Sequence, residues 1–111
     1  MSYSLIWAAD ATDELVEIFT FQKEKYGAKR AMEVYEKIHE RVVVTKTLPE
    51  TGRVVPELTA IGVTDIRELI ENPWRILYQV NGERVEVISV IDGRRNFEEV
   101  LYRKIMDGKL I

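Results

Sequence analysis

Arginine side chains recur in the second half of the chain, at positions where their charge could bind a phosphate or another anion. Arg67 and Arg75 fall in two neighbouring predicted strands, and Arg94 and Arg95 follow a third. Arg53 precedes them in a predicted loop. A guanidinium group can bind phosphate through two parallel hydrogen bonds. The candidate target-binding or anion-binding residues are therefore Arg53, Arg75, Arg94 and Arg95.

Cleavage of RNA by its own 2′-hydroxyl group would need proton transfer as well as neutralisation of charge. If the protein is a ribonuclease, the candidate catalytic residues are Arg67, Arg75, Arg94, Arg95 and Tyr102. Asp92 stands just before the arginine pair, and an ordinary aspartate, with a pKa of about 3.9, accepts but does not donate a proton near neutral pH. A carboxylate at this place would also repel the RNA phosphate. Ribonuclease activity is therefore disfavoured. If the protein does cleave RNA, Tyr102 is the residue that could replace the missing acid.

The candidate arginines have structural interpretations too. Arg75 could pair with Glu68 across two strands, and we weigh this role equally with a functional one. The Arg94–Arg95 pair could be neutralised by Asp92 or by the acidic residues at 98 and 99. Among the other candidates, Trp74 and Tyr78 are interpreted as core residues and His39 as a solvated helix residue.

The composition limits the chemistry further. The chain has 111 residues, no cysteine and a single histidine, so we expect no disulfide, cysteine ligand, metal centre or cofactor. Its net charge of −3 argues against broad capture of nucleic acid, so such binding would require a local cluster of Arg or Lys. One domain over residues 1–111 is expected. We find no membrane span or leader, which predicts a cytoplasmic protein.

The first half predicts a strand followed by a helical hairpin. Residues 3–8 form the strand, and Asp10 is the expected cap of a helix that ends at Gly27. A second helix is expected over residues 28–47, and the short turn between the two makes the helices antiparallel. The predicted buried stripe of the second helix consists of Ala28, Ala31, Tyr35, Ile38, Val42 and Thr45.

The second half predicts a loop, three strands and a closing helix. The loop covers residues 49–63, and the strands cover residues 66–70, 74–80 and 84–91. Asn81-Gly82 predicts a type I′ hairpin turn. Asn96 is the expected cap of a helix over residues 97–108. The fold class is α+β, with an N-terminal strand, an antiparallel helical hairpin packed on a small, mainly antiparallel sheet, and a short C-terminal helix.

Several short motifs, in this order, resemble the RelE/ParE superfamily of toxins, the plasmid-stabilisation proteins of type II toxin–antitoxin modules. They are Ile6-Trp7, the stretch from Leu48 to Arg53, Pro56-Glu57-Leu58, residues 66–69, residues 73–78 and residues 87–95. The resemblance extends over residues 6–100 and implies a growth-inhibiting toxin that a cognate antitoxin neutralises. Toxin and antitoxin would form a hetero-oligomer.

The resemblance leaves three functions open. ParE-like members inhibit DNA gyrase, and we favour this one because the expected histidine and lysine chemistry of the RNA-cleaving members is absent. RelE-like members cleave mRNA in the ribosome, which would make the ribosome and mRNA the partners. The third possibility is a degenerate member that retains only antitoxin binding.

Overall fold

The elements of the fold were located in a computed structural model that describes residues 2–110. They follow in the order β1 (Ser4–Trp7), α1 (Ala9–Tyr26), α2 (Ala28–Val43), the 3-10 helix η1 (Val44–Lys46), β2 (Arg53–Val54), α3 (Pro56–Thr59), β3 (Ile66–Glu71), β4 (Trp74–Asn81), β5 (Arg84–Asp92) and α4 (Phe97–Met106). The strands form one sheet in the order β1-β5-β4-β3-β2. Strand β1 pairs parallel with β5, and the other pairs are antiparallel.

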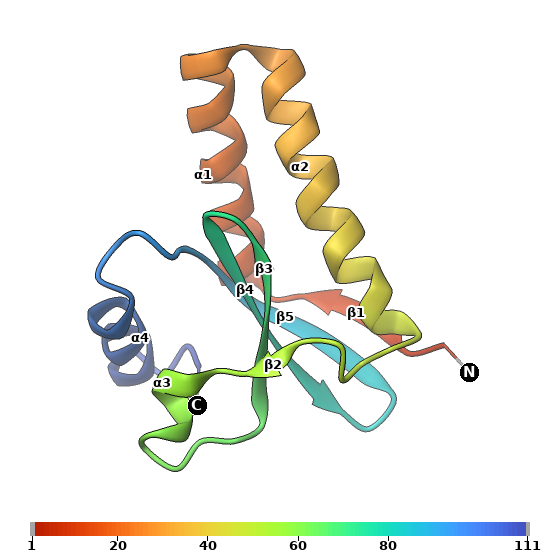
Figure 1. The fold of residues 1–111 in the computed structure, drawn as a ribbon, viewed down its shortest axis with the longest axis vertical. Coiled ribbons are helices and arrows are strands. Elements are labelled where there is room, and N and C mark those ends of the chain that lie inside the picture. The colour runs from red at the N-terminus through yellow and green to blue at the C-terminus, as the bar shows by residue number, and fades with distance from the viewer. Residues whose placement is uncertain (1, 111) are drawn as a thin grey trace.

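Helices α1 and α2 form an antiparallel hairpin that covers one face of the sheet. Its contact with the sheet is apolar: Leu15 and Ile38 from the helices share a buried cluster with Ile76 and Val87 from the strands. Figure 1 shows the hairpin rising beyond the sheet, with its turn at the end of the molecule farthest from α3. The turn is the single residue Gly27, whose φ of 94° favours glycine.

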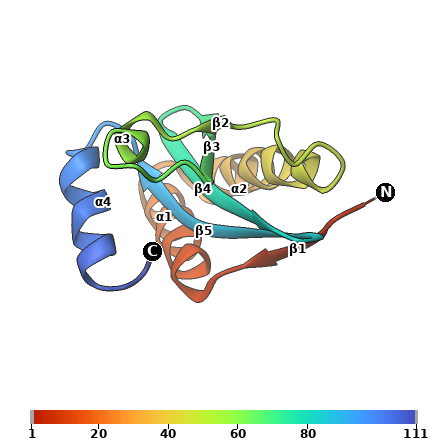
Figure 2. The ribbon, with the colours of Figure 1, turned by 90° about the horizontal axis from the view of Figure 1, so that it is seen from below.

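Helices α3 and α4 cover the opposite face of the sheet. Leu58 of α3 and Phe97 of α4 lie in a second buried cluster with Leu77 and Ile88 of the sheet. Figure 2 shows α4 at the α3 end of the molecule, away from α2. Strand β5 is therefore buried on both faces, which explains its nearly continuous run of apolar residues.

The predicted architecture is confirmed in its strands, its helical hairpin and its closing helix. The Asn96 side chain accepts a hydrogen bond from the Glu99 backbone N–H, so the predicted cap of α4 is confirmed. Trp74 and Tyr78 are core residues, as predicted. His39 is exposed, which agrees with its prediction as a solvated residue.

Two predictions about the helices were wrong. Asp10 does not cap α1, because the helix begins at Ala9 and the Asp10 carboxylate binds Lys104 instead. On α2, the buried stripe includes Val34, whereas Tyr35 is 39% exposed. Ala28, the first residue of the predicted stripe, is exposed as well, and the buried positions of α2 are Ala31, Val34, Ile38 and Val42.

Two predictions about the connections were also wrong. The expected loop over residues 49–63 contains β2 and α3, because Arg53 and Val54 pair with β3 and Pro56 starts a short helix. The β4–β5 turn is Gly82-Glu83, because Asn81 still pairs with Arg84. Only Gly82 has a positive φ there, as in a type II′ rather than a type I′ turn.

Candidate functional site

Arg75 is the centre of an ion cluster between the sheet and helices α3 and α4. Its two Nη atoms each donate a hydrogen bond of 2.9 Å to the Glu57 carboxylate on α3. Nη2 also lies 2.8 Å from Glu68 Oε2 on the neighbouring strand β3. The Glu68 side chain is fully buried and accepts a further hydrogen bond of 2.8 Å from Arg53 Nε. The predicted Arg75–Glu68 pair is therefore confirmed, as part of a larger cluster.

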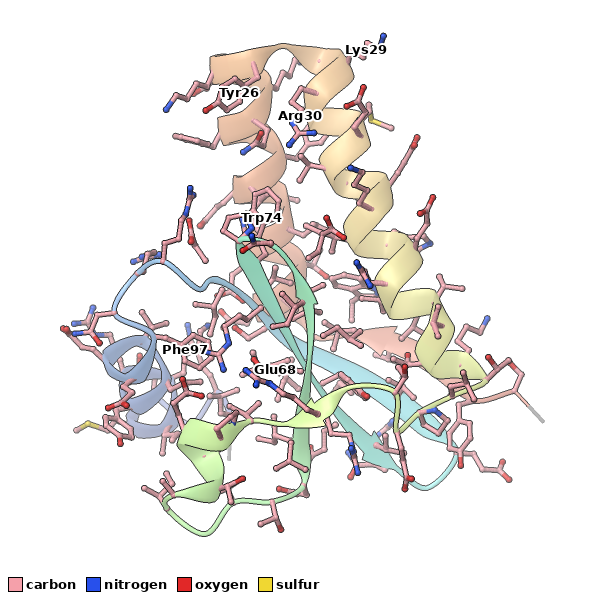
Figure 3. All side chains as sticks on the ribbon, in the orientation of Figure 1. Tyr26, Lys29, Arg30, Glu68, Trp74 and Phe97 are labelled. Atoms are coloured by element: carbon pink, nitrogen blue, oxygen red, sulfur yellow. The ribbon has the colours of Figure 1, made fainter. Side chains whose placement is uncertain are left out.

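The cluster keeps the Arg75 guanidinium charged and turned inward. Burial by itself would lower the pKa of Arg75, but the hydrogen bonds to Glu57 and Glu68 outweigh it and raise the pKa. The pKa of Glu57 is lowered, chiefly by its hydrogen bonds from Arg75. The guanidinium carbon also lies 3.5 Å from the centroid of the Phe97 ring, a cation–π contact that joins α4 to the cluster. Figure 3 labels Glu68 near β3 and Phe97 near α4, the two elements that the cluster joins.

Arg67 and Arg75 lie on adjacent strands, as predicted, but their side chains are on opposite faces of the sheet. Arg67 pairs with Tyr78, whereas Arg75 pairs with Ile70, three residues along β3 from Arg67. Successive side chains of a strand point to opposite faces, so this odd separation divides the two arginines. Arg67 donates a hydrogen bond of 2.8 Å to the Gly52 carbonyl at the sheet edge. The two side chains therefore do not converge on one face of the sheet.

The Tyr78 hydroxyl binds the backbone of the same loop, at Pro49 and Gly52, through two hydrogen bonds. It donates to the Pro49 carbonyl at 2.8 Å and accepts from the Gly52 N–H at 2.9 Å. Burial raises the pKa of Tyr78, which keeps the phenol protonated. The loop passes so close that a Cβ at Gly52 would lie 2.5 Å from the Glu68 backbone oxygen. Arg67 and Tyr78 are thus structural supports of the loop that carries Arg53.

The arginine pair after β5 faces carboxylates. Arg94 binds Asp92 through two side-chain hydrogen bonds of 3.1 and 2.9 Å, and its hydrogen bonding holds the pKa of Asp92 below the ordinary value. Asp92 is therefore ionised near neutral pH and cannot serve as an acid. Arg94 and Arg95 line a hollow of about 390 Å³ that also contains the carboxylates of Glu14, Glu17 and Asp92. Asp92 thus pairs with Arg94, as the structural interpretation expected, whereas Arg95 forms no ion pair with a described carboxylate.

Tyr102 lies apart from the arginine pair. It is 43% exposed on α4 and lines a shallow surface with Arg103 and Met106, not the hollow of Arg94 and Arg95. The predicted catalytic residues are therefore divided among the two faces of the sheet, the β5–α4 turn and the outer side of α4. Of these residues, Arg75 lies next to the β5–α4 turn, since a Cβ at Gly93 would lie 3.0 Å from Arg75 Cδ.

Three features of the surface were not predicted from the sequence. Glu57 and Phe97 complete the Arg75 cluster, although only Glu68 was considered as a partner. Lys104 of α4 lies 2.6 Å from Asp10 and 2.8 Å from Glu14 and so fastens α4 to α1. The Glu14 carboxylate extends this cluster to β5 by accepting hydrogen bonds from Ser89 Oγ and the Val90 N–H.

The third feature is an apolar groove of about 710 Å³ along the helical hairpin. It is lined by Trp7 of β1 and by helix residues Thr12, Leu15, Val16, Phe19, Met32, Tyr35 and His39. Val16 is 58% exposed and Met32 44% exposed, a large apolar exposure for a chain of this size. The Tyr35 and His39 rings stack at 6.1 Å along its wall.

Two kinds of site are absent from the part of the chain that the structure describes. Within residues 2–110 there is no group of three or more His, Cys, Asp or Glu side chains that could hold a metal ion. No helix in that span combines the length and apolar character needed to cross a membrane.

Comparison with known proteins assigns the family. A model of the ParE toxin of type II toxin–antitoxin systems (parDE) matches residues 5–97. The chain belongs to the ParE toxin family. Toxin ParE3 of Caulobacter vibrioides is 29% identical over 91 residues, a match that covers 82% of this chain and 87% of that protein. The predicted RelE/ParE resemblance is thereby confirmed.

Solved structures confirm the fold of this ParE-family toxin. A chain of the chromosomal ParDE system from P. aeruginosa superposes with a TM-score of 0.68 at 22% identity, covering 82% of this chain and 96% of that one. A double mutant of E. coli toxin RelE in the free state gives 0.59 at 22% identity, covering 96% and 98%. The Mycobacterium tuberculosis RelBE2 complex gives 0.57 at 13% identity, covering 83% and 92%. At these identities the likeness extends to the fold alone.

Proposed function

We propose that this ParE-family toxin inhibits growth by binding DNA gyrase, and that a cognate antitoxin neutralises it. The observation that carries the choice of a binding mechanism is the position of Arg75. Its charge is matched by Glu57 and by the buried Glu68, and its side chain lies on the opposite face of the sheet from Arg67. Charge neutralisation of a reacting phosphate would need free cations that converge on one point.

The β5–α4 turn favours the same mechanism. Asp92 occupies the place where an RNA-cleaving relative would need a proton donor, and its lowered pKa keeps it ionised. Its carboxylate also binds Arg94, so one of the two arginines of this turn is not available to a phosphate. Inhibition by binding requires neither a general acid nor a converging set of cations, so we favour it over ribosome-dependent cleavage of mRNA.

The apolar groove along the helical hairpin supports a protein partner, and we assign it to the antitoxin. An amphipathic helix could place its apolar face against Val16, Phe19 and Met32, because such helices bind hydrophobic grooves through side chains spaced three and four residues apart. The bound helix would then also cover the stacked rings of Tyr35 and His39. Neutralisation would follow if the bound segment prevents the toxin from engaging its target.

The proposed target is tested with purified gyrase and relaxed plasmid. Supercoiling should fall as the toxin is titrated through the micromolar range and should recover when the antitoxin is added in equal amount. As a counter-assay, mRNA in a translating extract should remain intact at the same toxin concentration. Full supercoiling together with cut mRNA would replace this proposal with RelE-like cleavage. Full supercoiling with intact mRNA and normal growth would indicate a degenerate member.

The proposed antitoxin site is tested with a Met32→Glu variant, which places a charge in the groove. Its toxicity should persist while neutralisation by the antitoxin is lost. Lys37→Glu is the matched control, because Lys37 is exposed on the same helix but does not line the groove. If antitoxin binds the Met32→Glu variant as tightly as the control, the groove is not its binding site.

A further inference from the structure

The turn of the helical hairpin carries a cluster of cations that the rest of the fold does not neutralise. Lys23, Lys25, Lys29 and Arg30 lie within four residues of Gly27, and Glu24 is the only acidic residue among residues 21–30. We call residues 21–30 the hairpin tip. Its formal charge is +3 in a chain whose net charge is −3. It is therefore the local cluster of Arg or Lys that nucleic-acid binding by an acidic protein would require.

The lysines of the hairpin tip are free. Considering the carboxylates of residues 2–110, none lies within ion-pair distance of Lys23, Lys25 or Lys29, whereas Arg30 reaches Glu33 at 3.6 Å. This differs from the arginines at the sheet, where Arg53, Arg75 and Arg94 all bind carboxylates. Three of the four sites that the sequence favoured for anions are thus occupied by the protein's own acids. The fourth, Arg95, forms no ion pair with a described carboxylate but stands alone, whereas the hairpin tip gathers three such cations.

The fold gains no stability from some of these cations. Lys29 and Arg30 stand in the first turn of α2, which contains no acidic residue. The N-terminal end of a helix carries a partial positive charge, so cations in its first turn are unfavourable. Glycine precedes them, and no side chain caps this helix end. Residues that oppose local stability in this way are expected where another function retains them.

Two exposed aromatic rings accompany the charges. Phe21 is 55% exposed and Tyr26 is 58% exposed, and Lys25 Nζ lies 5.5 Å from the centroid of each ring. Figure 3 shows Tyr26, Lys29 and Arg30 together at the outer end of the hairpin, remote from Glu68 and Phe97. The hairpin tip thus projects from the molecule, where it can reach a partner before the sheet does.

The chemistry of the hairpin tip fits a phosphate backbone better than a protein surface. Its free cations are lysines, and lysine is depleted from protein–protein interfaces. A lysine ammonium group binds phosphate as a point charge without a fixed geometry, and tyrosine hydroxyls donate hydrogen bonds to phosphate oxygens. We propose that the hairpin tip binds the phosphate backbone of duplex DNA through Lys23, Lys25 and Lys29, with Tyr26 as a neutral donor.

This inference rests on the proposed function for its choice of DNA, since gyrase holds a DNA duplex while it acts. Three phosphate contacts are too few for strong binding by the toxin alone. They would add to the protein contacts with gyrase and make inhibition sensitive to salt. The toxin would thereby favour gyrase that has DNA bound over free gyrase.

The test uses a fluorescent DNA duplex and a tip variant that combines Lys23→Gln, Lys25→Gln and Lys29→Gln. The control variant combines Lys37→Gln, Arg84→Gln and Arg103→Gln, which are exposed cations away from the tip. Both lose three charges, so they remain equal in net charge. The tip variant should nearly keep its melting temperature, because removal of Lys29 from the positive end of α2 offsets the loss of Lys23 and Lys25 from the negative end of α1.

The wild-type and control proteins should bind the duplex weakly, with a slope of about −2.7 in a plot of log affinity against log salt, as expected for about three released counterions. This slope is a loss of about 40-fold for a fourfold rise in salt. In the tip variant the slope should approach zero. Tyr26→Phe should weaken binding without changing the slope, while Tyr102→Phe on α4 should leave both unchanged.

Two results would overturn the inference. One is equal DNA affinity and slope in the tip and control variants. The other is displacement of DNA by poly-glutamate at matched charge, which would assign the hairpin tip to an acidic protein segment.

Measuring gyrase inhibition by the wild type and by the tip variant distinguishes a failure of this inference from a failure of the proposed function. If wild-type toxin inhibits gyrase and the tip variant requires at least about tenfold more protein, both are supported. Equal inhibition by the two, with equal DNA binding, contradicts the inference alone. DNA binding through the hairpin tip without any inhibition of gyrase contradicts the proposed function alone.

Discussion

Replacing Arg75 by methionine should destabilise the protein far more than the same replacement of an exposed arginine. Methionine keeps an apolar stem against Phe97 but leaves Glu68 without its main partner. The Glu68 side chain is fully buried and that of Arg75 is only 13% exposed. Removing one partner of a buried ion pair costs about 3–5 kcal/mol, because the other charge remains buried without compensation.

Arg53 limits the loss, because it still binds Glu68 at 2.8 Å, although its own side chain is 63% exposed. We therefore expect Arg75→Met to lower the free energy of unfolding by about 3 kcal/mol. For a domain of this size, that corresponds to a fall in Tm of roughly 10–20 °C. Arg94→Met is the matched control, because the Arg94 side chain is 74% exposed and should contribute less than about 1 kcal/mol.

The assay is urea unfolding followed by circular dichroism, at neutral pH and again near the pKa of an unfolded glutamate, about 4.3. The folded-state pKa of Glu57 is lowered by Arg75, so this pair stabilises the fold above that pH and the contribution is lost as the pH falls. Arg75→Met lacks this pair and therefore has no such contribution to lose as the pH falls. The difference in the free energy of unfolding between wild type and variant should therefore be smaller in acid than at neutral pH.

The reasoning fails if Arg75→Met loses no more stability than Arg94→Met at neutral pH. It also fails if the difference between wild type and Arg75→Met is larger in acid, because the unpaired carboxylates would then not be its cause. A double variant, Arg75→Met with Glu68→Gln, should recover part of the lost stability, since the buried charge is removed with its partner.

Three further substitutions test the edge loop and the attachment of α4. Gly52→Ala should destabilise the fold by at least about 2 kcal/mol in thermal unfolding, because its Cβ would lie 2.5 Å from the Glu68 backbone oxygen; a wild-type Tm would show that the loop is not held there. Tyr78→Phe should cost about 1–3 kcal/mol through two lost hydrogen bonds to the loop, against almost nothing for the exposed Tyr102→Phe. Lys104→Met should cost about 2 kcal/mol, because Glu14 loses its ion pair and Asp10 keeps only its 3.3 Å contact with Lys109, and amides of α4 should then exchange hydrogen faster. Unchanged exchange in α4 would contradict the fastening role of this lysine.

The strands and the hairpin could be predicted from the sequence because local patterns determine them. The apolar run of β5, the period of α2 and the cap at Asn96 each depend on nearby residues. The Arg75–Glu68 pair was also within reach, since both residues lie in one β-hairpin. The same hairpin register would have placed Arg67 on the opposite face, had the turn before Trp74 been assigned.

The rest depended on contacts between distant parts of the chain. Glu57 reaches Arg75 only because α3 folds back over the sheet, and nothing near residue 57 indicates this. Lys104 and Asp10 are 94 residues apart. The sequence shows the lysines of the hairpin tip, but there they look like ordinary residues at the end of a helix. Only the structure shows that the tip projects beyond the sheet and that its lysines have no carboxylate partners among the described residues.

The most direct test of gyrase binding is the amount of linear plasmid DNA recovered after gyrase, ATP and purified toxin are incubated together and the protein is then removed with detergent and protease. A toxin that binds the gyrase–DNA complex should trap cleaved DNA, so the linear product should rise with toxin concentration and fall when antitoxin is present. If linear DNA stays at the level of the toxin-free reaction and supercoiling also proceeds at its full rate, gyrase is not the target.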